Sequence, residues 1–280
     1  MTYQPGLYSA DQISNSEYHA QRDVLSASGA KAIMGESLGH FRHQQDNPVH
    51  KDAFDAGTAA HELVLEGEFR SVKVLDFADY KTKAAQEAKK DAYAEGLTPM
   101  LERDLADIRG MAKAIRNNAD AMALLEAGQP EVSAFWQDRD TGAHLRTRYD
   151  WLPAIDPDKR LVIPDYKTAK TANPSAFARD AGKYRYHQQA AWYIDTILTM
   201  GLHHNVAFVF IVQEKVAPYA SSVVQLSSAD IELGRQLNAV AIRKFRHSME
   251  TGVWPTYPGV TQIELPVYTH YEGESQIDAA

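Results

Sequence analysis

Apolar positions change their spacing near residue 128, and this change divides the chain into two parts. In the stretch DAFDAGTAAHELVLEGEF (52–69), apolar and small residues recur every three or four positions, which predicts a helix that carries His61 and ends at Gly67. A long helix is predicted over residues 100–127, with a Thr-Pro pair as its cap and first position. The first part of the chain is therefore predicted to be mainly helical.

Beyond this point the pattern becomes that of strands. The stretches EVSAFWQ and AHLRTRYDWL flank Asp140-Thr141-Gly142, a combination that predicts a β-hairpin. LVIPDYKTA (161–169) predicts a third strand, and the apolar, β-branched stretch NVAFVFIVQE predicts a buried strand with SSVVQL as its antiparallel neighbour. Three further helices are predicted from their caps and stops: residues 174–182, residues 186–200 and a final helix capped by Ser228.

This order of elements predicts an α/β fold with a central mixed β-sheet flanked by helices and an N-terminal helical region. No feature marks a boundary, so a single domain is expected over residues 1–272. Within it, residues 1–127 form the helical part and residues 128–260 hold the sheet and its helices, while residues 273–280 are expected to be a disordered tail.

The composition limits the kinds of metal site and catalytic residue that the chain can have. The 280 residues include no cysteine, which excludes disulfides, thiolate zinc sites, iron–sulfur clusters and a cysteine nucleophile, and leaves oxygen and imidazole as metal ligands. Magnesium or manganese is therefore favoured over zinc. The chain has no long apolar run and no signal-like N-terminus, so a cytoplasmic protein without membrane contact is expected. Its net charge of -8 still allows nucleic-acid binding, because a nuclease needs positive charge only along one channel.

The stretch LVIPDYKTA contains the first candidate site. Because side chains alternate along a strand, Asp165 and Lys167 are predicted to point the same way, with Tyr166 opposed. Such a pair suits phosphodiester chemistry, since a carboxylate can hold a divalent cation while a lysine stabilises negative charge or orients the attacking water. The alternative interpretation is a surface ion pair, which contributes less than ~1 kcal/mol.

A second carboxylate can join this pair. Arg146, Arg148 and Asp150 share one face of the second hairpin strand, and Asp150 lies at its end, where it can meet Asp165 from the neighbouring strand. Asp150 could instead be the ion-pair partner of either arginine. A metalloprotease is excluded, because the motif H-E-x-x-H that starts at His61 requires a second histidine where the chain has leucine.

Gln189 and Tyr193 are four positions apart on a predicted helix and therefore share one of its faces. Taken alone, this spacing also fits an amphipathic helix with an aromatic core face. Its meaning depends on the rest of the chain.

Taken in order, these residues resemble a known nuclease pattern: Gly57 with His61, Glu131, Asp150, Asp165-Tyr166-Lys167, and Gln189 with Tyr193. The order resembles the RecB-like branch of the PD-(D/E)XK nuclease superfamily. More narrowly, the stretches GTAAHELVLEG, EVSAFW, TGAHLRTRYDWL, DYKTAKTANPSAFA and YRYHQQAAWYIDT are similar to the exodeoxyribonuclease VIII family, the RecE-type phage and prophage nucleases. The similarity covers roughly residues 25 to 260.

The resemblance implies a restriction-endonuclease-like core and a Mg²⁺-dependent exonuclease, with Mn²⁺ as a substitute. Such an enzyme degrades one strand of linear duplex DNA from its 5′ end and leaves a 3′ overhang for a strand-annealing partner of the RecT type. By resemblance, Lys167 orients or activates the attacking water, Glu131 supports the site, and Gln189 and Tyr193 position the lysine or the DNA. The metal ligands implied are His61, Asp150, Asp165 and the backbone carbonyl of Tyr166.

The resemblance also points to a ring-shaped homo-oligomer, a tetramer, around the duplex. Enclosure would hold the enzyme on DNA better than the charge of an acidic monomer. The residues expected to line such a channel are basic: Arg146, Arg148, Lys170, Arg179, Lys183 and Arg185. The alternative for these residues is scattered surface charge.

Two other functions remain open at this stage. One is a different PD-(D/E)XK DNA nuclease, such as a structure-specific endonuclease or a repair-complex subunit. The other is an inert DNA-binding or anti-nuclease module, although Lys167 and both aspartates are present. Metal-dependent release of nucleotides from linear but not closed circular DNA would separate these readings from an exonuclease.

Overall fold

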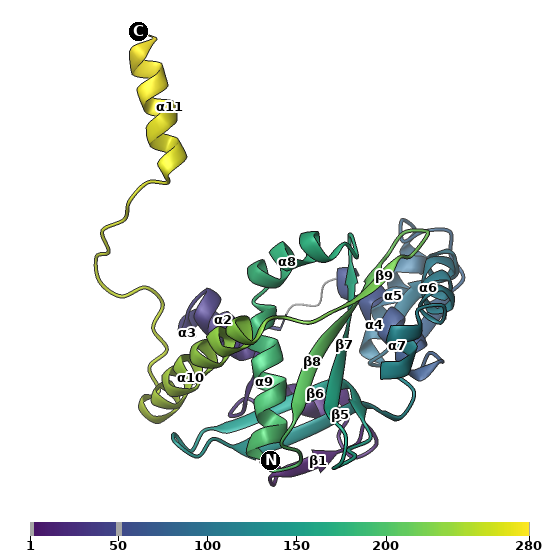
Figure 1. Cartoon of the computed structure of the whole chain (residues 1–280). Helices are drawn as coiled ribbons and strands as arrows, with labels where there is room; N and C mark the ends of the chain where they lie inside the picture. Colours follow the sequence, from purple (N-terminus) through teal and green to yellow (C-terminus); the bar gives the residue numbers. More distant parts are fainter. Residues whose placement is uncertain (1–2, 49–51, 280) are drawn as a thin grey trace.

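The computed structural model describes residues 3–48 and 52–279 of the chain, and it has an α/β architecture with sheets in the centre and helices around them (Figure 1). One sheet has the strand order β1-β5-β6-β2, a second has the order β7-β8-β9, and β3 pairs with β4 in the N-terminal half. The strands are β1 (Gly6–Tyr8), β2 (Leu25–Ser26), β3 (Val72–Leu75), β4 (Thr98–Leu101), β5 (Gly128–Gln137), β6 (His144–Pro153), β7 (Leu161–Ala169), β8 (Val206–Glu214) and β9 (Ser221–Val224).

The first sheet is built on the β5–β6 hairpin, which confirms the predicted turn. Asp138 accepts hydrogen bonds from the backbone N–H and the hydroxyl of Thr141 at 2.8 and 2.6 Å. Gly142 follows with a φ of 70°, a left-handed conformation that glycine adopts without a steric penalty. The strands then pair antiparallel from Gln137 opposite His144 to Gly128 opposite Pro153, with one interruption at Glu131.

The second sheet contains the predicted third strand. β7 and β8 run parallel, with Asp165 opposite Phe210, and β9 pairs antiparallel with the other side of β8. The parallel arrangement requires a crossover between β7 and β8, and two helices, α8 (Pro174–Lys183) and α9 (Tyr186–Thr199), provide it. This places the residues after β7 and the start of α9 at the same end of the sheet (Figure 1).

Helices surround both sheets, and the N-terminal half is mainly helical, as predicted. They are α1 (Asn15–Ala20), α2 (Ala27–Gly35), α3 (Leu38–Asp46), α4 (Asp52–His61), the π-helix η1 (Glu62–Glu66), α5 (Lys83–Ala94), α6 (Glu102–Ile115), α7 (Ala119–Leu124), α8 (Pro174–Lys183), α9 (Tyr186–Thr199), α10 (Ser228–Thr251) and α11 (Val267–Asp278). Over the two described ranges, none of these helices has the length and apolar character that crossing a membrane requires.

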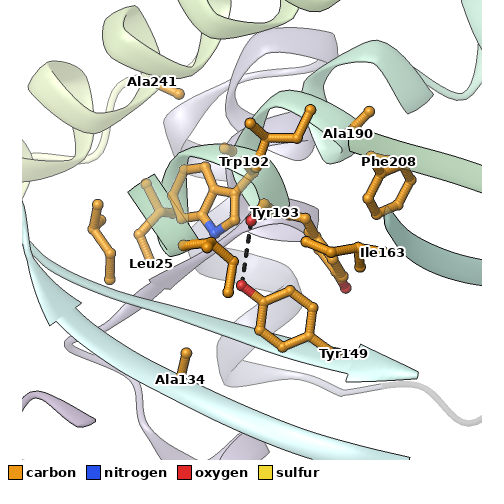
Figure 2. Packing of buried hydrophobic residues seen from close by; sticks show 14 of the residues in the cluster. Leu25, Ala134, Tyr149, Ile163, Ala190, Trp192, Tyr193, Phe208 and Ala241 are labelled. Carbon is orange, nitrogen blue, oxygen red and sulfur yellow. Dashed lines mark hydrogen bonds between the residues drawn. The ribbon is translucent and has the colours of Figure 1, made fainter. Parts of the chain in front are cut away.

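The main core lies where α9 meets both sheets (Figure 2). Trp192 and Tyr193 of α9 pack toward Tyr149 of β6, whose hydroxyl donates to the carbonyl of Tyr193 at 3.2 Å. Ile163 of β7 and Phe208 of β8 close the cluster from the second sheet. The helix that carries Gln189 is therefore fixed by buried contacts to every strand around the candidate site.

A second core covers the opposite face of β7 and β8. Tyr166 and Ile211 point from these strands toward Ala60 of α4 and Leu105 of α6. Since neighbouring residues on a strand face opposite sides, the burial of Tyr166 here directs Asp165 and Lys167 toward the α9 side. The same core places the end of α4, and with it His61, beside β7.

The prediction of one long helix over residues 100–127 is wrong. Residues 98–101 form β4, because they pair with β3, and the helix starts only at Glu102. A second break follows after α6, where Asn118 accepts a hydrogen bond from the N–H of Ala121 and so caps the separate helix α7. Tertiary pairing of β3 with β4 thus overrides the Thr-Pro cap signal.

Two boundaries near the C-terminus also differ. The cap of α10 is Ser227 rather than Ser228, because the Ser227 hydroxyl accepts from the N–H of Asp230. The tail expected to be disordered from residue 273 instead continues helix α11, which starts at Val267. This helix has exposed side chains and projects away from the sheets (Figure 1), so backbone hydrogen bonding rather than burial holds it.

The contact between α9 and α10 gives a prediction for stability. A Cβ added to Gly234 of α10 would lie 2.1 Å from the carbonyl oxygen of His187, whereas one added to Gly182 of α8 would meet nothing within 4 Å. Gly234→Ala should therefore destabilise the protein by about 1–3 kcal/mol, the usual cost of overpacking. Gly182→Ala, the matched control, should be neutral or stabilise by up to ~1 kcal/mol, since alanine favours helix. Urea unfolding of both variants measures the difference, and equal stability would contradict the close approach.

Candidate active site

Asp165 and Lys167 lie on the same side of β7, as predicted, and form the centre of the site. The Lys167 Nζ atom lies 2.5 Å from Asp165 Oδ2, and the Gln189 side chain donates a hydrogen bond to Oδ1 at 2.6 Å. Burial raises the pKa of Asp165 to about 6, although the charge of Lys167 opposes this. For Lys167, burial alone would lower the pKa, but the charges of Asp165 and Asp150 outweigh it and raise the pKa, so the amine stays protonated.

Gln189 is held in place through its neighbour. The Gln188 side chain donates to Asn238 Oδ1 of α10 at 3.1 Å, and Asn238 Nδ2 donates back to the Gln188 carbonyl at 2.8 Å. The two adjacent glutamines thus have different tasks: Gln188 joins α9 to α10, and Gln189 binds Asp165. The resemblance implied that Gln189 positions the lysine or the DNA, whereas in the structure its side chain binds the Asp165 carboxylate beside the lysine.

Asp150 lies at the junction of the two sheets. β6 and β7 do not form a ladder, and instead Asp150 Oδ2 accepts a hydrogen bond from the backbone N–H of Tyr166 at 3.2 Å. Burial raises the pKa of Asp150, and the charge of Lys167 acts against this rise. The predicted meeting of Asp150 with the Asp165 strand is therefore present, but a side chain, and not sheet pairing, joins the strands.

His61 reaches this junction from the end of α4. Its Nδ1 lies 3.6 Å from Asp150 Oδ2, and its ring packs edge-on against Tyr166 with 5.1 Å between centroids. Burial, with the charge of Lys167 as a further cause, lowers the pKa of His61 to about 4. The imidazole is therefore neutral at physiological pH, which is the form that can bind a metal ion.

Glu131 faces Asp150 across the hairpin with a strained backbone. Its neighbours Pro130 and Val132 pair with the residues of β6 on either side of Asp150, whereas Glu131 itself has a φ of 52°. A left-handed residue in a strand is uncommon outside glycine and asparagine and is often found at functional sites. Burial and the nearby Asp150 raise the pKa of Glu131 to about 8, so the side chain is protonated at neutral pH.

Arg146 and Arg148 share one face of β6 as predicted, but they contact the N-terminal segment. Both guanidinium groups lie over the ring of Tyr18, at 4.6 and 4.4 Å from its centroid. Arg146 is buried and donates to the Tyr18 carbonyl, while Arg148 donates to the Ile13 carbonyl at 2.9 Å and lies 3.8 Å from Glu131. Because Arg146 has no exposed face, its predicted contact with DNA is not supported.

The other basic residues predicted to bind DNA lie after β7 and around α8. Lys170, Arg179 and Lys183 are exposed, and Arg185 is half-buried with a φ of 55° just before α9. Within residues 3–48 and 52–279, none of the four has an acidic partner within 4 Å. The four residues follow the end of β7 in the chain, along α8 and the turn before α9, and we call them the basic rim. Their contact with DNA stays a prediction.

Tyr193 is largely buried and contacts strand β6 next to the site. Its hydroxyl donates to the Arg148 carbonyl at 2.7 Å, and its ring packs edge-on against Tyr149 with 5.2 Å between centroids. Burial raises its pKa well above the usual range, so the hydroxyl is neutral. This position fixes the backbone of β6 just before Asp150.

Lys31 was not found by the sequence interpretation, yet it belongs to the same cavity. This cavity of about 340 Å³ is lined by Lys31, Lys167, Asp150, Glu131 and Gln189 together with residues of α1 and α2. The Lys31 Nζ atom lies 5.4 Å from the centroid of the Tyr186 ring, and the Lys167 Nζ atom lies 5.5 Å from the same centroid. Burial and the charge of Lys167 lower the pKa of Lys31 to about 8.

The donor atoms of the site fit a hard divalent cation in their chemistry. Asp165 is buried, and its Oδ2 atom lies 2.5 Å from the Lys167 ammonium, so a cation at this oxygen would share it with the lysine. His61 Nδ1 and Asp150 Oδ2 lie close together, and neutral imidazole and carboxylate oxygens are suitable ligands. Over the described part of the chain, however, no three His, Asp or Glu side chains converge on one point.

Comparison with known proteins places this geometry in context. Residues 26–264 match the family described as "PDDEXK-like domain of unknown function (DUF3799)". The fold is similar to the crystal structure of a candidate exonuclease from Eubacterium rectale, with a TM-score of 0.62 and 14% identity, over 97% of this chain and 100% of that chain. The structure of SSO0001 has a TM-score of 0.28 and 12% identity, over 68% of this chain and 85% of that chain, which is too little to support an argument. No curated protein matches the chain.

The likeness confirms the predicted fold class. The chain has the α/β core of the PD-(D/E)XK proteins, with a central mixed sheet flanked by helices. Since the structural likeness is distant in sequence, it supports the fold and leaves activity to be argued from the site.

The protonated state of Glu131 gives a prediction of pH dependence. Its pKa is about 8 in the folded chain against 4.5 as the ordinary value, so its contribution to stability is complete below pH 4.5 and is lost as pH rises toward 8. Glu131→Gln cannot ionise, so in chelator its thermal stability relative to the natural chain should increase across this window and level off above it. Glu126→Gln, at an exposed position, is the matched control. A difference that does not change with pH would contradict the half-buried, protonated carboxyl.

Proposed function

Because the chain belongs to the PDDEXK-like DUF3799 family, we propose that it is a metal-dependent exodeoxyribonuclease that acts on the ends of linear double-stranded DNA. The observation that carries this proposal is the buried Asp165, held by Gln189 and paired with Lys167, beside a cavity that Lys167, Gln189 and Asp150 line. A structural ion pair does not need a second buried carboxylate, a neutral histidine and an open cavity beside it. Phosphodiester hydrolysis uses each of these groups.

The divalent metal proposed is Mg²⁺, with Mn²⁺ as a substitute, and nucleases with this fold generally use such ions. The residues that would hold it are Asp150, Asp165 and His61, with the Tyr166 carbonyl as a further oxygen. When bound, the ion would polarise the phosphate and lower the pKa of a water molecule. The raised pKa values of Asp150 and Asp165 support this assignment, since both carboxylates lie where a nearby cation would favour their charged form.

Lys167 has the task of stabilising charge. Its pKa is raised by the two carboxylates, so it enters the reaction protonated and cannot act as a general base at neutral pH. A fixed, mostly buried ammonium is worth most where negative charge develops on the phosphate or where a water molecule must be oriented. Gln189 keeps Asp165, and through it Lys167, in a single position.

Lys31 adds a second cation on the α2 side of the cavity. Over the described ranges it has no acidic partner within 4 Å, so its charge is available to a substrate phosphate. Burial has lowered its pKa to about 8, and a phosphate beside it would favour the protonated amine. Lys31 would therefore bind DNA, together with the basic rim of Lys170, Arg179, Lys183 and Arg185.

The proposed details of the reaction and of the assembly follow the resemblance to the exodeoxyribonuclease VIII family. They comprise 5′-to-3′ degradation, a 3′ single-stranded overhang, a strand-annealing partner of the RecT type and a ring-shaped homo-oligomer, in the form of a tetramer. The net charge of -8 supports enclosure of DNA, because an acidic chain gains little from nonspecific attraction to phosphates.

The metal site is tested by replacing its carboxylates. Asp150→Asn and Asp165→Asn should each lower the turnover of a linear duplex more than about 100-fold, since each removes a charged metal ligand. Asp140→Asn, at the exposed hairpin turn, is the control and should keep full activity. Release of nucleotides is measured on linear and closed circular DNA with Mg²⁺ and with chelator. Cleavage of the circle would show an endonuclease, and turnover by either variant at the natural rate would refute the site.

The two lysines are separated by their kinetics. Lys31→Ala should raise KM about tenfold with a small change in kcat, and should reduce the salt dependence of binding by about one phosphate contact. Lys167→Met should instead lower kcat strongly and leave KM close to that of the natural chain. Lys113→Ala, exposed on α6, is the matched control for loss of a surface charge. If Lys31→Ala lowers kcat alone, Lys31 is not a binding residue.

A further inference from the structure

After α10, residues 253–257 pack against the rest of the protein, and we call this short segment the root. The Gly39 N–H donates to the Pro255 carbonyl at 3.0 Å, and a Cβ at Gly39 would lie 2.6 Å from Thr256 Cγ2, so glycine permits this approach. Trp254 packs against Phe41 and Phe245, with 6.0 and 6.1 Å between ring centroids. The root therefore has a fixed direction where it leaves the body.

Beyond the root the chain forms an arm, residues 258–278, that ends in α11 and stands away from the sheets (Figure 1). Apart from the half-buried Thr269, its described side chains are exposed. The exposed residues include apolar ones: Val260, Ile263, Leu265, Val267, Tyr268, Tyr271 and Ile277. An arm that leaves this many apolar side chains in water is typical of a segment that docks elsewhere.

The arm is also acidic. It carries Glu264, Glu272, Glu274 and Asp278, and residues 252–280 contain neither lysine nor arginine. A surface that receives it should therefore combine positive charge with apolar lining.

Such a surface lies at the C-terminal end of α10, beside the root. A cavity of about 310 Å³ is lined by Arg243, Lys244 and His247 together with Leu38 and other apolar residues. Over residues 3–48 and 52–279, neither Arg243 nor Lys244 has an acidic partner within 4 Å. Ser248 in the same lining is fully buried, and its hydroxyl has no hydrogen-bond partner among the described residues. The cavity thus has unpaired cations and an unsatisfied donor at an apolar wall.

We propose that this basic cavity of one copy binds helix α11 from the arm of a second copy of the chain. The charges are complementary, and the apolar side chains of the arm match the apolar lining of the cavity. Residues 258–266 include Pro258 and Pro266, and an extended, proline-containing segment of this length spans about 28 Å. Val253 and Pro255 of the root line the cavity of their own chain, so α11 could enter that cavity only if residues 258–266 folded back on the root.

The contact joins two different surfaces, the arm of one copy and the cavity of the next. A contact of this heterologous kind links copies head to tail and gives a ring when the rotation closes. The inference therefore deepens the proposed ring and rests on that assembly, but it is independent of the catalytic residues.

Cross-linking provides the test, because the natural chain has no cysteine. Lys244→Cys and Tyr271→Cys are made separately in full-length chains of different mass, mixed and oxidised. A covalent heterodimer is expected from this pair and is absent when Glu87→Cys, exposed on α5, replaces Lys244→Cys. Equal cross-linking with both partners, or none with Lys244→Cys, would overturn the proposal.

Charge reversal provides a second, independent measurement. Arg243→Glu with Lys244→Glu, or Glu272→Lys with Glu274→Lys, should weaken self-association about tenfold or more in light scattering, and combining both sets should restore it. Arg139→Glu at the hairpin turn is the control. Unchanged association of the single sets, or a natural chain that stays monomeric, would overturn the docking. Metal-dependent cleavage of a short duplex by the same variants reports the catalytic site separately, so failure of the arm and failure of the nuclease proposal are distinguishable.

Discussion

The buried charge of Asp165 is the constraint on which the rest of the site depends. An isolated carboxylate in a protein interior costs several kcal/mol, so it must be paired and hydrogen-bonded. Lys167 from the same strand supplies the charge and Gln189 from α9 supplies the hydrogen bond. Because Gln189 lies on α9, a shift of this helix would remove the hydrogen bond and leave the buried Asp165 carboxylate less well compensated. The close approach of α10 to α9 and the contact of Gln188 with α10 therefore act on the active site, although neither touches it.

The same arrangement disfavours the charged forms of three carboxyl groups in the folded chain. Asp150, Asp165 and Glu131 all have raised pKa values, and Glu131 adds a strained backbone. Groups whose charged forms are disfavoured together are commonly found where a protein binds a cation. A ligand that binds only the folded state stabilises it in proportion to its affinity. A bound cation would therefore offset part of the cost of placing these carboxylates together.

Local patterns predicted the strands and the position of Asp165 and Lys167, because alternation along a buried strand is decided by neighbouring residues. The hairpin turn and the cap of α8 at Asn173 follow from equally local signals. The long helix at 100–127 failed because pairing between β3 and β4 is not local. Lys31 was missed for a related reason: only tertiary structure brings α2 beside β7. A lysine next to the S-A-S cap of a short helix carries no signal of its own in a single sequence.

The distribution of ion pairs explains how an acidic chain can present positive charge to DNA. Several arginines away from the site have acidic partners, as in Arg22 with Asp46, Arg109 with Glu102 and Arg235 with Asp195. Around the site, by contrast, Lys31 and the basic rim after β7 lack such partners over the described part of the chain. A local excess of positive charge acts over about a Debye length, ~8 Å at physiological salt, so distant acidic residues do not cancel it. The net charge of -8 therefore limits long-range attraction to DNA, while the cavity keeps the charge that a phosphate would meet on arrival.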